Sequence, residues 1–287
     1  MRVGCLPGKA EAHISAISHH WNQLKPAEHG SWSLLLTPYL IGVGLAAVVR
    51  PSNGAPLPLA LFTVLALAVF LARQPVGTLL RIQRGRARRA GLPLAGLWAL
   101  GLGLLAIGCG AGLLASGRGA LLPLAIPALI TLAASLAISA LAGPRGLALE
   151  IVGSLGLALA APGALAAMTG TLDGLALVAW SISAAHSLVS ILYVRWRIAA
   201  RHDRASQRMR AVVVMSHVVV FAGGVAGGLA GTLPWSLALP FGLLLARAVW
   251  VAWRTPPLTD VRRFGFGEMG LALAFAALVV LAYAAPR

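Results

Sequence analysis

One short segment of this chain contains six arginines and no acidic residue. It extends from Arg73 to Arg89, and long apolar runs flank it on both sides. A cluster of arginines does not stay in hydrocarbon, and between two membrane-length runs it lies at the water interface, normally on the cytoplasmic side. A second such segment, from Arg195 to Arg210, again carries six arginines. We therefore expect both segments to lie on one face of a membrane protein.

The composition excludes an ordinary soluble fold. The chain is 59% hydrophobic and 10% charged, with a mean hydropathy of +0.86, which leaves too little polar surface to cover 287 residues in water. We predict an all-α fold, a polytopic bundle of membrane helices. The net charge of +16 is spread over short loops between apolar runs, the pattern of topology signals and of contacts with anionic lipids. Membrane lipids are thus the expected partners, and nucleic acid is not, because no soluble basic domain would present these charges.

Nine apolar runs have close to the roughly twenty residues that a helix needs to cross a bilayer. Pro162 lies late in the fifth run and should kink its helix rather than break it. We predict a cytoplasmic N-terminal segment over residues 1–30 and a single transmembrane helical domain over residues 31–287. The expected spans are residues 33–49, 57–72, 92–115, 120–141, 147–168, 175–194, 211–231, 233–253 and 269–285.

The basic residues predict the orientation of these spans. With nine spans, nineteen Lys and Arg residues fall on the side of the N-terminus and three on the other side, while Arg247 lies within a span. Lys and Arg collect in cytoplasmic loops. We therefore expect a multi-pass protein of the cell membrane, or inner membrane, with the N-terminus in the cytoplasm and the C-terminus outside.

The acidic residues are few enough to interpret singly. Glu28 precedes the first span, Glu150 lies in the first turn of the fifth, and Asp203 stands among the arginines of the second segment, so all three belong to the predicted cytoplasmic face. Asp173 is expected to cap the sixth span. Asp260 and Glu268 flank the ninth span, where we expect solvated side chains.

Two histidines lie inside predicted spans. His186 is nine residues before Arg195, and His217 is seven residues after Arg210, so the imidazoles should lie about 13 Å and about 10 Å below the second arginine segment. A histidine in lipid faces the bundle interior and is a candidate functional residue, here for ligand binding. The alternatives are a hydrogen bond between helices and a bis-imidazole haem site.

Other site motifs are absent from the sequence. Cys5 and Cys109 are far apart and imply neither a disulfide framework nor a metal site. The glycine-rich stretch from Gly223 to Gly228 lies inside a span, where close helix packing explains it better than phosphate binding does. We expect no metal ligands.

The junction Pro26-Ala27-Glu28-His29-Gly30-Ser31-Trp32, followed by an apolar run with Pro38 and Gly42, resembles the start of the YwiC-like family of bacterial membrane proteins. Arg73-Gln74-Pro75 after the second run is also similar to that family. The size and hydropathy of the chain agree with the resemblance. It implies a multi-pass membrane protein.

The layout also resembles, more distantly, the UbiA superfamily of intramembrane prenyltransferases. That resemblance implies nine helices, a cytoplasm-facing active site and two catalytic loops at the positions of the two arginine segments. Enzymes of that superfamily hold magnesium and a prenyl diphosphate with aspartate-rich motifs in both loops. Here the first segment has no acid and the second has only Asp203. One carboxylate does not assemble that magnesium cluster, so we expect no magnesium-dependent catalysis of the usual kind.

The first functional hypothesis is a protein whose arginines bind an anionic lipid, or an isoprenoid or quinone headgroup. The guanidinium groups would replace the metal as bidentate phosphate partners. The arginines in question are Arg73, Arg81, Arg84, Arg195, Arg197 and Arg201. The expected cytoplasm-facing cavity is lined by Glu28, His29, Arg73, Gln74, Glu150, His186, Arg195 and Asp203. For any single arginine, the alternative is a role in topology and lipid contact alone.

Two other hypotheses stay open. An enzyme, such as a divergent prenyltransferase, would use Glu28 and His29 as an acid and base pair, with Asp203 as a further catalytic candidate. The alternative for that pair is helix capping. A transporter, or an accessory subunit of a respiratory complex, is the third hypothesis. Transporters usually place charges near the membrane midplane, whereas the polar residues here gather at the cytoplasmic end.

Overall fold

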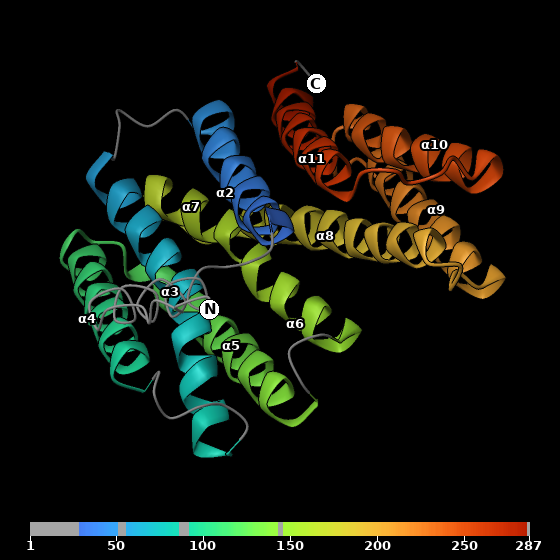
Figure 1. The fold of residues 1–287 in the computed structure, drawn as a ribbon. Helices are drawn as coiled ribbons and strands as arrows, with labels where there is room; N and C mark the ends of the chain where they lie inside the picture. Colours follow the sequence, from blue (N-terminus) through green and yellow to red (C-terminus); the bar gives the residue numbers. More distant parts are fainter. Residues whose placement is uncertain (1–28, 51–55, 86–91, 143–145, 286–287) are drawn as a thin grey trace, which may run out of the picture.

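The computed structural model describes residues 29–50, 56–85, 92–142 and 146–285, and within them the predicted all-α fold is confirmed. The helices α2, α7 and α8 lie in the middle of the molecule, with α3 to α5 on one side and α9 to α11 on the other (Figure 1). The helices are α2 (His29–Val49), α3 (Pro56–Gln83), α4 (Leu92–Ala115), α5 (Leu122–Ala142), α6 (Leu147–Ala158), α7 (Ala160–Thr169), α8 (Gly174–Arg201), α9 (Gln207–Leu229), α10 (Ala238–Arg254) and α11 (Val261–Ala284), with short 3-10 turns at Gly119–Leu121 and Trp235–Leu237.

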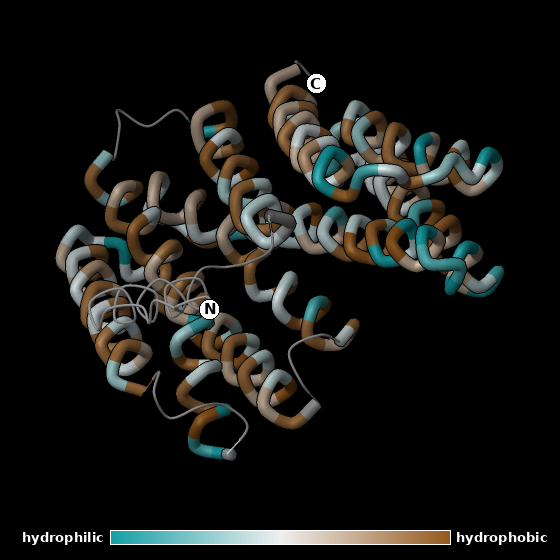
Figure 2. The backbone as a smooth tube through the Cα atoms, viewed as in Figure 1, coloured by the Kyte–Doolittle hydropathy of each residue, from teal (hydrophilic) through white to brown (hydrophobic). Residues whose placement is uncertain are grey.

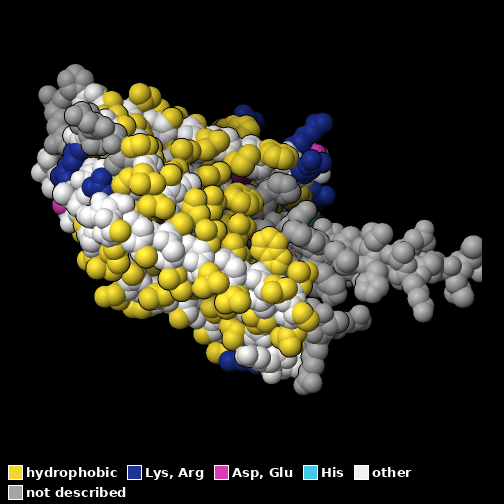
Figure 3. Space-filling model, turned by 90° about the vertical axis from the view of Figure 1, so that its left-hand side faces the viewer, with side chains coloured by type: hydrophobic (Ala, Val, Ile, Leu, Met, Phe, Trp, Pro, Cys, Tyr) yellow, Lys and Arg dark blue, Asp and Glu magenta, His cyan; other side chains and the backbone are white. Residues whose placement is uncertain are grey.

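In the part of the chain that the structure describes, nine helical stretches are long and apolar enough to cross a membrane, as predicted. The fifth, Leu147–Thr169, consists of α6 and α7 together. Hydrophilic residues gather at the ends of α3, α8 and α10 (Figure 2). One side of the molecule is broadly hydrophobic, with Lys and Arg side chains at its edges (Figure 3). This distribution fits a multi-pass membrane protein.

Three helices extend further than the hydropathy pattern predicts. The helix α3 continues to Gln83, so that Arg73 and Arg81 are helical, and α8 continues to Arg201. Arginine is a good helix former, and a positive charge in the last turn interacts favourably with the helix dipole. The helix α11 begins at Val261, eight residues before the predicted span. Charged residues that end an apolar run therefore do not end these helices.

The short helix α7 is the most enclosed element, because residues 160–167 are all buried. Pro162 cannot donate a hydrogen bond to the carbonyl group of Ala158, and the fifth span divides at Leu159, so the expected kink separates two helices. The helix α2 packs closely against α7. A Cβ atom added at Gly42 would stand 2.1 Å from the carbonyl oxygen of Ala161, so only glycine fits there.

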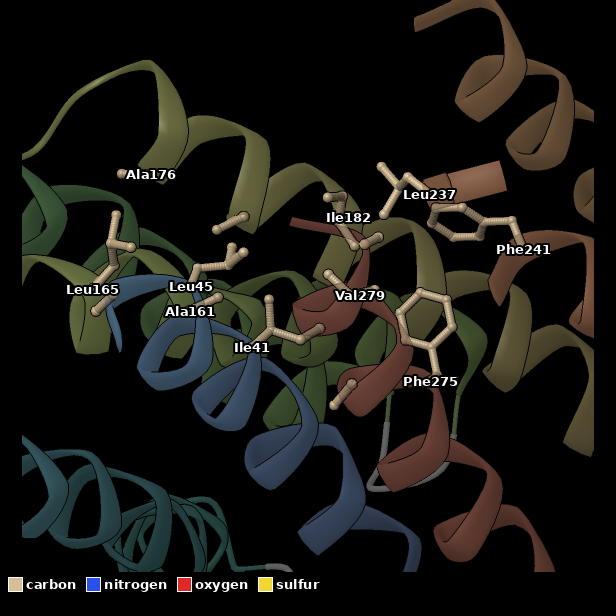
Figure 4. Packing of buried hydrophobic residues seen from close by; sticks show 14 of the residues in the cluster. Ile41, Leu45, Ala161, Leu165, Ala176, Ile182, Leu237, Phe241, Phe275 and Val279 are labelled. Atoms are coloured by element: carbon tan, nitrogen blue, oxygen red, sulfur yellow. The ribbon is translucent and has the colours of Figure 1, made fainter. Parts of the chain in front are cut away.

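The main hydrophobic core joins the first and second halves of the chain (Figure 4). Ile41 of α2 and Leu165 of α7 pack in one cluster with Ile182 of α8, and Phe275 of α11 closes it. The side chains of Ile41 and Leu165 are completely buried. The packing of α7 thus depends on helices from both halves.

The turns that carry few basic residues meet at one end of the bundle. Arg50, after α2, forms a salt bridge with Asp173 at the start of α8, and its Nη1 donates to Thr171 Oγ1 at 2.6 Å. The carboxylate of Asp173 also accepts from the backbone N–H groups of Leu175 at 3.0 Å and Ala176, which confirms the predicted N-cap. Partial burial raises the pKa of Asp173, but the hydrogen bonds from Arg50 and the helix N-terminus outweigh that effect, so the pKa is below 3.8.

The opposite end of the bundle, called the basic end here, contains the end of α3, the start of α6, the α8–α9 and α10–α11 connections, and the first turns of α9 and α11. Arg197 Nη2 donates to the carbonyl oxygen of Pro256 at 2.8 Å, and Arg201 Nη1 donates to that of Thr259 at 3.2 Å. These bonds join the α8–α9 turn to the α10–α11 connection. The helices α8 and α10 therefore end at the same end of the bundle.

Candidate functional site

Arginines from both arginine-rich segments meet on helix α6. Arg195 of α8 donates from Nη1 to Oε1 of Glu150 at 2.8 Å, and each side chain is 39% exposed. Glu150 lies in the first turn of α6. The N-terminus of α6 favours the negative charge of this carboxylate. The carboxylate also pairs with the guanidinium group of Arg195, which water still reaches.

Arg73 of α3 reaches the next turn of the same helix. Its Nη1 lies 3.4 Å from the position that a Cβ atom would take at Gly153, which is ordinary van der Waals contact. Gly153 is three residues after Glu150, hence about one turn further along α6. We call Arg73, Glu150 and Arg195 the arginine site. Arg73 and Arg195 are 122 positions apart in the sequence, and the fold brings them together at α6.

The other predicted ligand-binding arginines lie elsewhere. Arg81 is half-buried and donates from Nη2 to Thr78 Oγ1 at 3.1 Å, and Arg84 is exposed in the turn after α3. Arg197 and Arg201 contact the α10–α11 connection, as described above. Gln74 is half-buried, and its backbone carbonyl accepts from the hydroxyl group of Thr78. Of the predicted set, the structure therefore brings together Arg73, Glu150 and Arg195.

The structure describes only some of the side chains that were predicted as catalytic candidates. Glu28 lies outside the described residues, and His29 is the first residue of α2, with its side chain outside the description. Asp203 is exposed in the turn after α8 with a φ of 54°, a conformation that aspartate tolerates better than most residues. Among the described residues it has no salt bridge. No acid and base pair is therefore defined.

Both predicted intramembrane histidines are buried. His186 is 4% exposed and stacks on the Phe275 ring of α11 at 4.2 Å between centroids. His217 is 2% exposed, and its Nδ1 donates to the carbonyl oxygen of Val213 in its own helix at 2.8 Å. The described residues hold no group of three or more His, Cys, Asp or Glu side chains that could bind a metal ion.

A second arginine–glutamate pair lies inside the bundle, where the sequence analysis predicted a solvated Glu268. Arg247 Nη1 of α10 donates to Glu268 Oε1 of α11 at 2.5 Å, and the two side chains are 20% and 19% exposed. The guanidinium carbon of Arg247 lies 3.9 Å from the ring centroid of Tyr193 on α8. The prediction for Glu268 was wrong because α11 begins two turns before this residue.

A signal for this pair was present in the sequence. Arg247 is seven residues before Arg254, the end of α10, and Glu268 is seven residues after Val261, the start of α11. Both therefore lie about 10 Å from the basic end, on consecutive antiparallel helices. A lone arginine in an apolar span requires a partner, and Glu268 is the acid at the matching depth.

Comparison with known proteins gives one match. No curated protein matches this chain. The model of the family described as YwiC-like protein matches residues 26–165, from the N-terminal junction through α2 to α6 and into α7. Over residues 26–165 this chain is therefore similar to the YwiC-like family, as the segments Pro26–Trp32 and Arg73–Pro75 predicted.

Proposed function

We propose that this multi-pass membrane protein binds the phosphate-bearing headgroup of an anionic lipid or an isoprenoid at the arginine site. The observation that carries the proposal is that Arg73 and Arg195, from two distant segments, contact successive turns of α6. Arginines that served topology alone would not need to converge, because only their presence on one side of the membrane matters for orientation.

The charges at the arginine site favour an anion. The guanidinium groups of Arg73 and Arg195 both lie at the first turns of α6, whose N-terminus also favours a negative charge. Each guanidinium can donate two parallel hydrogen bonds to a phosphate group, which a lysine cannot do. A headgroup would compete with Glu150 for Arg195, and the 39% exposure of both side chains leaves that exchange open to ligand from the interface. Such binding requires no metal ion.

The proposed orientation places the arginine site in the cytoplasm. The support is the distribution of Lys and Arg, nineteen residues on one side and three on the other. In the cell membrane, this side also faces the anionic lipids of the cytoplasmic leaflet. The ligand would then enter from the headgroup region of that leaflet.

The experiment compares ligand retention in matched variants of the full chain. The purified protein is incubated with phosphatidylglycerol or with geranylgeranyl phosphate, and bound ligand is counted by native mass spectrometry. Arg195→Lys keeps the charge but loses the bidentate geometry, so its affinity should fall by about tenfold. Arg208→Lys, in the exposed first turn of α9, is the control and should bind as the parent does.

The two probes separate the possible sources of the phosphate group. Preference for geranylgeranyl phosphate indicates an isoprenoid ligand, and equal binding indicates a general anionic lipid site. If Arg195→Lys and Arg208→Lys both retain ligand as the parent does, then the arginines serve topology only and the proposal fails.

A further inference from the structure

Arg247 has two buried hydrogen-bond donors for which the described part of the chain supplies no acceptor. Its Nη1 binds Glu268, but its Nε and Nη2 are shielded from solvent and have no hydrogen-bond partner among the described residues. These two nitrogens form one edge of the planar guanidinium group, with parallel N–H bonds suited to a group with two oxygens. A buried donor without an acceptor destabilises the fold, and such atoms in a native protein call for an explanation such as a bound water or ion.

The residues around this edge add to the positive charge. Tyr193 covers one face of the guanidinium group, and the charged groups that act on Tyr193 are Arg247, Glu268 and Arg197. Arg197 is 6% exposed. Among the described residues, these two arginines and one glutamate give one more positive than negative charge, and a charge within a membrane protein persists when it is paired. A ligand with a single negative charge would make the sum of these charges zero, whereas a dianion would leave a net negative charge.

The turn of α11 between the basic end and Glu268 is open at Gly265. Gly265 lies one turn before Glu268 on the same face of the helix, because three residues turn it by about 300°. A Cβ atom added at Gly265 would meet no atom within 4 Å, so no neighbouring side chain closes over that turn. The residual exposure of Arg247 and Glu268, 20% and 19%, agrees with such access.

This position is separate from the arginine site. Tyr193 and Arg195 are two residues apart on α8, so they point in directions about 200° apart around the helix. Arg195 faces Glu150 on α6, while Tyr193 faces Arg247 on α10. Ligands at the two positions would be divided by α8 itself.

We infer that Arg247 holds a second ligand, a monoanionic group with two oxygen acceptors, through its Nε and Nη2 between α8, α10 and α11. A carboxylate and a phosphodiester share this chemistry. The depth of about 10 Å below the basic end requires an apolar chain that accompanies the charged group into the membrane. The ligand is thus an amphiphile, either a long-chain carboxylate or a phospholipid.

The test uses dodecanoate and didodecyl phosphate as probes, with dodecanol as the neutral control. Binding to the purified full-length protein in a nonionic detergent is measured by equilibrium dialysis. We expect saturable binding of at least one anion and none of dodecanol. Arg247→Lys keeps the pairing charge but lacks the Nε and Nη2 edge, so it should weaken binding about tenfold or more. Arg254→Lys, in the exposed last turn of the same helix, is the matched control.

A second measurement, on the parent protein, tests the inference if Arg247→Lys does not fold. Dodecanoate labelled with ¹³C at its carboxylate should show a shifted infrared carboxylate band when bound to the parent protein, because the guanidinium group donates to both oxygens. Stronger binding of dodecanoate than of didodecyl phosphate identifies a carboxylate ligand, and the reverse identifies a phosphodiester. All these affinities are compared in protein that also carries Arg195→Lys, which weakens phosphate binding at the arginine site equally in every sample, so failure at the arginine site does not affect this result.

Three results would overturn the inference. The first is no saturable binding of either anion, and the second is an unshifted carboxylate band where dodecanoate does bind. The third is equal affinity in Arg247→Lys and Arg254→Lys.

Discussion

Two arginine–glutamate pairs lie on opposite sides of α8 and differ in their surroundings. In the pair Arg195–Glu150 both side chains are 39% exposed, and the arginine belongs to the proposed headgroup site. In the pair Arg247–Glu268 the exposure is about half as large, and an aromatic ring covers the guanidinium group. Water screens the first pair and lets its partners exchange, whereas neither charge of the second can lose its partner without facing an apolar interior. The pair Arg195–Glu150 is thus suited to exchange of its partners, and the pair Arg247–Glu268 is suited to permanent pairing.

The strongest test of this difference removes one partner of the buried pair. Glu268→Ala leaves the Arg247 charge without its carboxylate inside the bundle, and we expect the free energy of unfolding to fall by about 3 kcal/mol. Denaturation in mixed micelles with increasing SDS measures this loss. The double variant Arg247→Met with Glu268→Leu removes both charges and should recover most of it. A single variant that is no less stable than the double variant would contradict the assignment.

A smaller effect should follow from removal of the ring over Arg247. Tyr193→Leu loses the cation–π contact and we expect a loss of about 1–2 kcal/mol, measured in the same way. Tyr193→Phe keeps the ring and is the control, with a stability close to that of the parent. Equal losses in both variants would assign the effect to the hydroxyl group instead.

The exposed pair should contribute less and should respond to salt. Glu150→Gln is expected to cost at most about 1 kcal/mol, because solvent screens a pair in which both side chains are 39% exposed. The difference from the parent should shrink further when NaCl is raised from 0.1 M to 1 M, since the Debye length falls from about 10 Å to about 3 Å. The loss in Glu268→Ala should hardly change over that range. An equal salt response of both variants would remove the distinction between the two pairs.

The smallest effect concerns Asp173, which pairs with Arg50 at the end opposite to the basic end. The pKa of Asp173 in the folded protein is below its ordinary value of 3.8, so its ionised form stabilises the fold. That stabilisation is complete at pH values above 3.8 and is lost as the pH falls through the folded pKa. Thermal melts should therefore show Asp173→Asn as less stable than the parent at pH 7, with a difference that shrinks below pH 3.8. A constant difference across this range would exclude the carboxylate charge as its cause.

Hydropathy and charge were sufficient to predict the spans, because both depend on local composition. Runs of about twenty apolar residues must be helical in lipid, and arginine clusters mark where they leave it. The helix ends were less predictable. Arg81 and Arg201 end an apolar run but continue a helix, since backbone hydrogen bonding extends into the interface when the residues have good helix propensity.

The site could be predicted only where the depth of two residues in the membrane is enough to bring their side chains together. Glu150 and Arg195 were expected to line one cavity, and the structure places them in contact. The direction of each side chain depends on how the helices are rotated, which spacing along one helix does not define. Arg197 and Arg201 therefore contact the α10–α11 connection instead of α6. The pair Arg247–Glu268 was missed because the ninth helix was expected to start after Glu268 rather than before it.

The enclosure of α7 has a consequence for how the protein assembles. The matched region ends at Leu165, inside this helix, and Leu165 packs in one cluster with Ile182 and Phe275, which the ribosome produces later. A nascent chain that has inserted only the matched helices leaves the α8-facing side of α7 in contact with lipid. The recognisable sequence signature is therefore shorter than the cooperative folding unit, and α7 reaches its final environment only after the last helix has been synthesised.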